Sequence, residues 1–127
     1  VIYIRPLPYF DTPPSCFLRP ISLPGSQCSP TISRSGLEAT MVSFDRILYE
    51  LQDEIPELRL VDGIAALCDA TSCSQKLPSG ELMYADHIHL SAAGGRYFAR
   101  SSGLADLIER ELGATPPAVP IAASPSQ

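Results

Sequence analysis

The longest periodic pattern in the chain runs from Ser35 to Pro56. Apolar residues recur there at steps of four, three, four, three and four positions, namely Leu37, Met41, Phe44, Leu48, Leu51 and Ile55. This spacing puts them on one face of an α-helix, and charged residues occupy the other face, which is typical of a solvated surface. Ser35 or Ser33 can cap the first turn, and Pro56 ends the pattern. We predict an amphipathic helix that packs on a sheet.

A second helical pattern follows His89. Ser91 is suited to be its N-cap, because the hydroxyl can accept from free backbone N–H groups of the first turn. The apolar stripe consists of Ala93, Tyr97, Leu104, Leu107, Ile108 and Leu112. The Ser-Ser-Gly sequence at 101–103 predicts a kink or break, and Gly113 ends the helix. Residues 1–113 are therefore the expected folded part, and the Pro-, Ala- and Ser-rich residues 114–127 are predicted to form a disordered tail.

Short apolar runs predict the strands. Val1 to Ile4 is rich in β-branched residues and ends at Arg5-Pro6, which predicts a buried strand whose exit is fixed by proline. Leu58 to Val61 is the second candidate strand, and Ile64 to Cys68 is a candidate helical turn after it. Leu82 to Tyr84 is expected to be a short extended piece.

Prolines interrupt the segment from Pro6 to Ser35. They stand at positions 6, 8, 13, 14, 20, 24 and 30, so we expect neither a helix nor a central strand there. A loop of this length is unusual in a compact domain unless a covalent link holds it.

The four cysteines form two local pairs. Cys16 and Cys28 lie within the proline-rich segment, and Cys68 and Cys73 bracket a shorter loop. Neither pair has the two-residue gap of a zinc knuckle, so we predict disulfides Cys16–Cys28 and Cys68–Cys73 and an oxidising compartment. The alternative is four buried free thiols in a reducing compartment.

Composition narrows the classes of partner. The chain has 127 residues, of which 45% are hydrophobic, enough for one domain or part of one. Its nine basic residues are scattered and the formal net charge is -5, so nucleic acid is not an expected partner. No apolar run is long enough to span a bilayer, and no signal peptide opens the chain. Val1 starts directly in an apolar run, which indicates a start inside a larger domain.

The candidate chemistry lies between Tyr84 and Phe98, where both histidines of the chain stand. A weak nucleophile needs histidine as its base, and the base needs a carboxylate that fixes its tautomer. Asp86, three residues before His89, can provide that carboxylate within one loop. In the alternative, His89 only makes a backbone hydrogen bond at the helix start. Asp86, His87 and His89 could also begin a metal site, but the chain has no further histidine to complete it.

The order Tyr84, Asp86, His89-Leu90-Ser91 and Gly94 resembles the last sequence block of the SGNH (GDSL-like) hydrolases. More narrowly, the chain is similar to the SGNH domain at the C-terminus of acyltransferase-3 membrane proteins, which O-acylate cell-envelope polysaccharides. The resemblance extends over Val1 to Leu112. Its supporting features are Arg5-Pro6-Leu7-Pro8, Cys16, Cys28, Leu67-Cys68-Asp69 and Cys73.

The resemblance implies a partial three-layer α/β/α fold with a parallel sheet, with His89 and Asp86 as two members of a Ser-His-Asp triad. SGNH enzymes take the serine from a Gly-Asp-Ser segment and one oxyanion donor from an asparagine, and this sequence contains neither. The N-terminal half of the domain is therefore expected to be a missing partner, with no cofactor required.

This resemblance further implies acyl transfer (O-acetylation) or ester hydrolysis on a glycan. A membrane acyltransferase domain is the expected second partner, and the expected location is periplasmic or extracytoplasmic. The alternative function is a catalytically silent binding module of the cell envelope.

Overall fold

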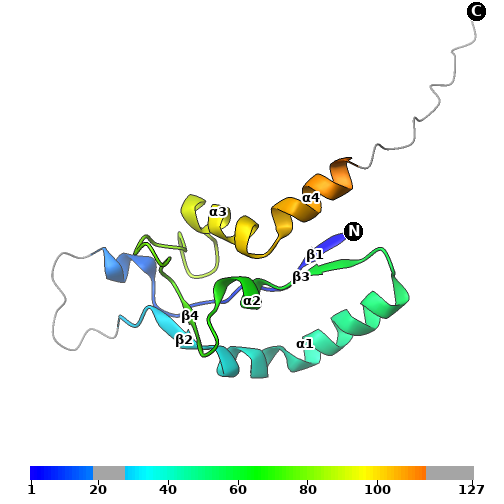
Figure 1. The fold of residues 1–127 in the computed structure, drawn as a ribbon. Helices are drawn as coiled ribbons and strands as arrows, with labels where there is room; N and C mark the ends of the chain where they lie inside the picture. Colours follow the sequence, from blue (N-terminus) through cyan, green and yellow to red (C-terminus); the bar gives the residue numbers. More distant parts are fainter. Residues whose placement is uncertain (19–27, 114–127) are drawn as a thin grey trace, which may run out of the picture.

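The structure, a computed structural model, describes residues 1–18 and 28–113 (Figure 1). The tail predicted for residues 114–127 lies outside this part. The strands are β1 (Ile2–Ile4), β2 (Thr31–Ser33), β3 (Arg59–Val61) and β4 (Ser72–Ser74). The helices are the 3-10 helix η1 (Pro14–Phe17) and the α-helices α1 (Arg34–Glu54), α2 (Gly63–Leu67), α3 (Ala92–Ser101) and α4 (Leu104–Gly113).

The two predicted apolar strands form a parallel pair. Tyr3 of β1 lies opposite Leu60 of β3, and the chain between the strands includes α1. In Figure 1, α1 lies on one side of this pair and α3 and α4 lie on the other. The expected partial α/β fold with a parallel sheet is confirmed.

Strand β1 forms where the sequence predicts it, but the prediction that it is buried is wrong. Tyr3 is 37% exposed and Ile4 is 41% exposed. The reason is that β3 is the one neighbour that β1 has in the described residues, so its other edge carries unpaired backbone groups.

Helix α1 agrees closely with the amphipathic pattern. The Ser33 hydroxyl accepts from the Gly36 N–H at 3.2 Å, which identifies Ser33 as the cap. The ring of Phe44 lies 6.4 Å from that of Tyr3 in β1, centroid to centroid. Leu48 is the one residue of the helix that is buried, so α1 covers the sheet with part of its apolar face and leaves the rest partly exposed.

A half-buried arginine, Arg5, fixes the exit of β1. The Arg5 Nε donates to Asp45 of α1 at 2.6 Å, and Nη1 donates to Asp62 at 2.9 Å. Asp62 also caps α2, since its Oδ1 accepts from the N–H groups of Ile64 and Ala65. Charge-assisted bonds of this kind connect the first strand, α1 and α2 at one point.

The proline-rich segment contains more regular structure than the sequence predicts. Within its described part, η1 forms at Pro14 and β2 forms directly after Pro30. Strand β2 pairs antiparallel with β4, and Ile32 lies opposite Cys73. The three proline-free residues of β2 can form this pairing because their partner strand, β4, lies far away in the sequence and not in the proline-rich segment.

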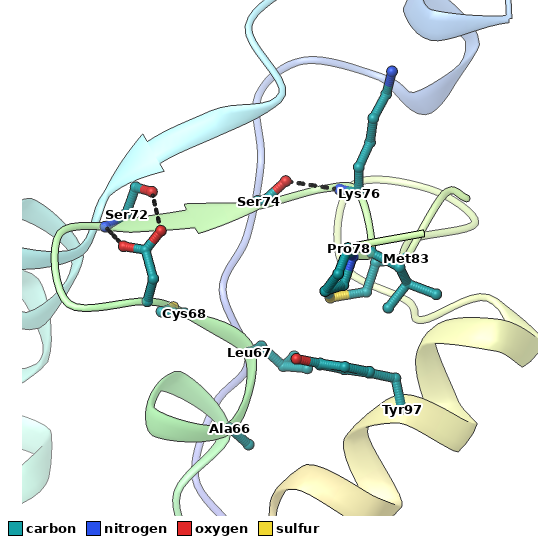
Figure 2. A pocket seen from close by; sticks show the side chains of 11 residues that line it. Ala66, Leu67, Cys68, Ser72, Ser74, Lys76, Pro78, Met83 and Tyr97 are labelled. Carbon is teal, nitrogen blue, oxygen red and sulfur yellow. Dashed lines mark hydrogen bonds between the residues drawn. The ribbon is translucent and has the colours of Figure 1, made fainter. Parts of the chain in front are cut away.

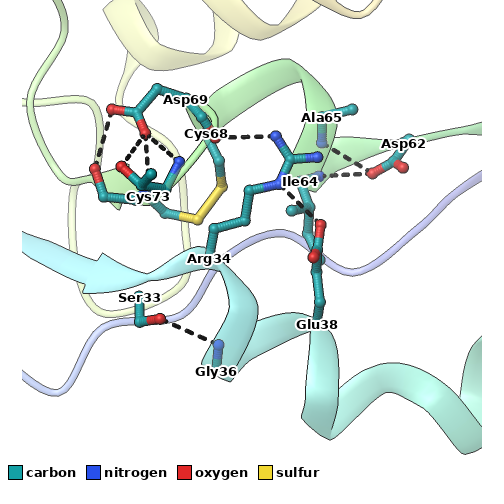
Figure 3. Close-up of a disulfide and its surroundings, with 12 residues drawn as sticks. Ser33, Arg34, Gly36, Glu38, Asp62, Ile64, Ala65, Cys68, Asp69 and Cys73 are labelled. Carbon is teal, nitrogen blue, oxygen red and sulfur yellow. Dashed lines mark hydrogen bonds and ion pairs between the residues drawn. A yellow bond between two sulfur atoms is a disulfide. The ribbon is translucent and has the colours of Figure 1, made fainter.

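Both predicted disulfides are present in the structure, Cys16–Cys28 and Cys68–Cys73. Figure 3 shows the second one beside the turn that leads into β4. The Asp69 carboxylate accepts from the N–H groups of Thr71 and Ser72 at 2.8 and 2.7 Å, and these bonds lower its pKa to about 2. Arg34 donates to the Asp69 carbonyl at 2.9 Å, which connects the turn to α1.

The core lies where the proline-rich segment, the β4 region and α3 meet. Its buried members are Phe10, Val61, Leu67, Cys73, Leu77, Met83, Tyr84 and Phe98. Gln75, also fully buried, donates from Nε2 to the Thr12 carbonyl at 2.6 Å and so attaches the proline-rich segment to the core.

The second helical pattern divides as predicted into α3 and α4. Gly103 has a φ of 71°, a backbone conformation that glycine adopts readily, and it separates the two helices. Gly94 of α3 packs directly on the backbone of Met83, so α3 lies against the segment that leads into the histidine loop.

Candidate active site

The loop between Tyr84 and Leu90 carries both histidines and is closed at its base. Tyr84 and Leu90 form a β-bridge, and the Ala85 N–H donates to the His89 carbonyl at 2.8 Å. The Tyr84 ring is 1% exposed and meets the Phe10 ring edge-on, with centroids 4.9 Å apart. This aromatic anchor fixes the loop to the core while its tip stays in solvent.

Asp86 and His89 form a hydrogen-bonded pair at the loop tip. The distance from His89 Nδ1 to Asp86 Oδ2 is 2.6 Å. Asp86 Oδ1 accepts from the backbone N–H groups of Ile88 and His89 at 2.9 and 2.7 Å. The carboxylate thus holds the imidazole and organises the backbone that carries it.

The donors around Asp86 determine its charge state. The backbone N–H of His89, that of Ile88 and the His89 side chain hold the pKa of this carboxyl well below its usual range. An ionised carboxylate can only accept, so Nδ1 of neutral His89 is its protonated nitrogen and Nε2 has the free lone pair. The His89 side chain is 73% exposed, and a group from outside can reach Nε2. The pair can act as a base and its orienter.

Ser91 has a structural role. Its hydroxyl donates to the Leu82 carbonyl at 2.8 Å and accepts from the Gly94 N–H at 3.0 Å. The predicted N-cap is confirmed, and the hydroxyl is committed to the start of α3. Within residues 1–18 and 28–113, the His89 ring has Asp86 as its hydrogen-bond partner and contacts no serine hydroxyl at bonding distance.

His87 points to the proline-rich segment. Its Nδ1 lies 2.7 Å from the Phe10 carbonyl oxygen, and the Phe10 N–H donates to the His87 carbonyl at 3.0 Å. The two histidines therefore have different hydrogen-bond partners: His89 bonds to Asp86 and His87 bonds to Phe10. In the described part of the chain, no group of three His, Cys, Asp or Glu side chains is arranged to hold a metal ion.

Two residues that the sequence reasoning did not identify lie beside His89. A concave surface, which encloses a volume of about 550 Å³, is lined by Tyr9, Asp11, Asp86, His87, Ile88 and His89. The Tyr9 hydroxyl donates to the Asp11 carboxylate, and this bond raises the Tyr9 pKa. The signal available in the sequence was the Tyr-Phe-Asp string among prolines, but nothing in it indicates that this string reaches the histidine loop.

A second cavity of about 460 Å³ lies between α2, β4 and α3, with Tyr97 and Met83 in its wall (Figure 2). The acidic residue of this cavity, Asp69, is not a candidate base, because its carboxylate already accepts hydrogen bonds from Thr71 and Ser72. The Lys76 ammonium extends to the Phe17 ring, 5.2 Å from its centroid. The loop that carries Asp86 and His89 therefore remains the candidate active site.

The carboxylate–histidine pair in the loop before α3 has the geometry of a base and of the carboxylate that orients it. The family model described as "SGNH domain (fused to AT3 domains)" matches residues 1–101. The chain belongs to this SGNH domain family. Neither the curated proteins nor the solved structures gave a match. No helix in the described part of the chain is long and apolar enough to cross a membrane.

Proposed function

We propose that this chain supplies the histidine and the aspartate of a Ser-His-Asp triad for acyl transfer (O-acetylation) or ester hydrolysis on cell-envelope glycans. The observation that carries the proposal is the 2.6 Å bond between His89 Nδ1 and Asp86, which leaves Nε2 unprotonated and exposed. The serine comes from another segment, the N-terminal half of the domain, because Ser91 is engaged as a helix cap.

The proposed reaction has two halves. His89 Nε2 takes the proton of the incoming serine hydroxyl as the serine oxygen attacks the acyl carbonyl carbon. The imidazolium then gives this proton to the leaving oxygen, so that an acyl-serine remains. In the second half, His89 deprotonates a glycan hydroxyl or a water as its oxygen attacks the acyl carbon of the acyl-serine. The imidazolium then returns this proton to the departing serine oxygen, so that the acylated glycan or the free acid leaves and the serine is regenerated. Asp86 stays ionised and stabilises the imidazolium in both halves.

The surroundings of the reaction follow from the family and the disulfides. Fusion of such domains to AT3 domains indicates a membrane-anchored protein with a membrane acyltransferase partner domain. Two disulfides fit an oxidising compartment, so we place the chain on the periplasmic or extracytoplasmic side. We assign residues 1–113 to the C-terminal portion of the SGNH domain.

Ester hydrolysis by the complete domain tests this proposal. p-Nitrophenyl acetate is offered to the chain alone, to the chain joined to its serine-bearing segment, and to the His89→Ala variant of the joined form. We expect turnover in the joined form alone. The triad assignment fails if His89→Ala turns over the ester as fast as the unchanged domain, and a silent binding module is indicated if no form is active.

A further inference from the structure

The segment around Phe10 is held against the histidine loop by several independent contacts. Phe10 exchanges two hydrogen bonds with His87, through its N–H at 3.0 Å and its carbonyl at 2.7 Å. The Phe10 ring is 1% exposed and packs edge-on against Tyr84. Two residues further on, the Thr12 carbonyl accepts from buried Gln75. The position of this segment relative to His89 is therefore fixed by the core.

These contacts determine what the neighbouring side chains do. Pro8 and Phe10 are buried, whereas Tyr9 and Asp11, which alternate with them along the chain, are exposed. Tyr9 and Asp11 both line the concave surface that also contains Asp86 and His89. Tyr9 is 53% exposed, and its bond to Asp11 holds the ring in one orientation while leaving part of it open to solvent.

We propose that Tyr9 and Asp11 form a sugar-binding subsite for an uncharged pyranose ring next to the candidate base. This inference rests on the proposed function, because it assigns the glycan to the surface beside His89. An aromatic ring can stack on the apolar C–H face of a pyranose, and a carboxylate can accept from two of its hydroxyls. Two carboxylates, those of Asp11 and Asp86, line this surface, and no Lys or Arg lines it. A uronic acid or another anionic sugar would therefore be repelled.

The test compares two acetate esters in the complete domain. One is a methyl pyranoside carrying a single O-acetyl group, and the other is methyl acetate, which has no ring to stack. We expect Tyr9→Ala to raise KM for the pyranoside ester on the order of 3- to 10-fold, the range for one aromatic contact, with kcat unchanged. The ratio of kcat/KM for the pyranoside ester to kcat/KM for methyl acetate therefore falls by the same factor. Tyr9→Phe keeps the ring and retains the preference for the pyranoside.

Tyr49→Ala is the matched control, because Tyr49 is 56% exposed but lines a different cavity with Arg5 and Asp45. The subsite is overturned if Tyr9→Ala and Tyr49→Ala have the same KM for the pyranoside ester while His89→Ala is inactive. It is also overturned if an acetylated uronic acid is preferred over the neutral pyranoside. If His89→Ala keeps full activity on methyl acetate, the proposed function fails instead.

Discussion

At the residue scale, Asp86 has two separable roles, and Asp86→Asn separates them. The amide oxygen can still accept from the backbone N–H groups of Ile88 and His89, so the loop is expected to keep its shape. The amide nitrogen is a donor and cannot accept from Nδ1, so His89 changes tautomer and Nε2 loses its lone pair. We expect kcat of the complete domain to fall on the order of 10³- to 10⁴-fold.

The measurement is steady-state ester hydrolysis together with the thermal unfolding midpoint. Asp86→Ala provides the comparison, because it removes the acceptor for the backbone as well and is expected to lower both activity and midpoint. An Asp86→Asn variant with unchanged kcat would show that the bond to His89 is not used in the reaction.

Asp69 gives a prediction for pH. Its pKa is lowered from 3.8 to about 2, first by the backbone N–H of Thr71 and then by that of Ser72. Between these two values the unfolded chain binds a proton that the folded chain does not, so this contribution to stability is complete above about 4 and is lost as the pH falls to about 2. We expect Asp69→Asn to reduce the acid dependence of the urea unfolding free energy. Identical pH profiles for the two proteins would contradict this account.

At the element scale, the placement of α3 depends on the absence of a side chain at Gly94. A Cβ there would overlap the Met83 carbonyl oxygen and lie 2.9 Å from its carbon, both backbone atoms that cannot give way easily. Alanine favours helices by about 1 kcal/mol over glycine, but overpacking costs about 1–3 kcal/mol, so the steric cost wins. We expect Gly94→Ala to lower the free energy of unfolding.

Gly95→Ala is the control in the same turn of α3. No atom outside its own turn lies within 4 Å of a Cβ at Gly95, so we expect that substitution to stabilise the protein slightly. Urea unfolding of both variants measures the difference. Equal effects of the two alanines would show that α3 does not pack on Met83 as described.

The helices and strands also show which parts of the fold can be predicted from the sequence. Helix α1, the Ser91 cap and the break at Gly103 depend on local periodicity and local capping, which can be read from neighbouring residues. Strands β2 and β4 depend on each other across about 40 residues of chain, and neither Thr31–Ser33 nor Ser72–Ser74 has a strand pattern of its own.

The candidate site likewise has one part that local sequence predicts and one part that distant contacts determine. The pairing of Asp86 with His89 is local, and the sequence predicts it. The approach of Tyr9 and Asp11 to the same surface depends on Phe10 and Gln75, whose burial is decided by distant partners. A phenylalanine among prolines and a glutamine before a lysine give no sequence signal of burial, so this half of the surface was missed.

At the scale of the whole molecule, the free edge of β1 predicts that the chain alone associates with itself. Ile4 is 41% exposed beside backbone groups that no described strand pairs. A lysine on such an edge disfavours strand addition. We expect Ile4→Lys to shift the isolated chain to the monomer in size-exclusion chromatography.

Ile47→Lys is the control, since Ile47 is 52% exposed but lies on α1, away from the strand edge. It is expected to leave the association unchanged. A monomeric unmodified chain, or equal effects of the two lysines, would contradict the role of the β1 edge.

The central claim is that His89 activates a serine that lies outside residues 1–127. Labelling of the complete domain with a fluorophosphonate, followed by peptide mapping, tests this most directly, because the reagent reacts with the activated serine. We expect one labelled serine, located in the segment joined to this chain, and no labelling in the His89→Ala variant. A label on Ser91, or undiminished labelling without the His89 side chain, would contradict the account.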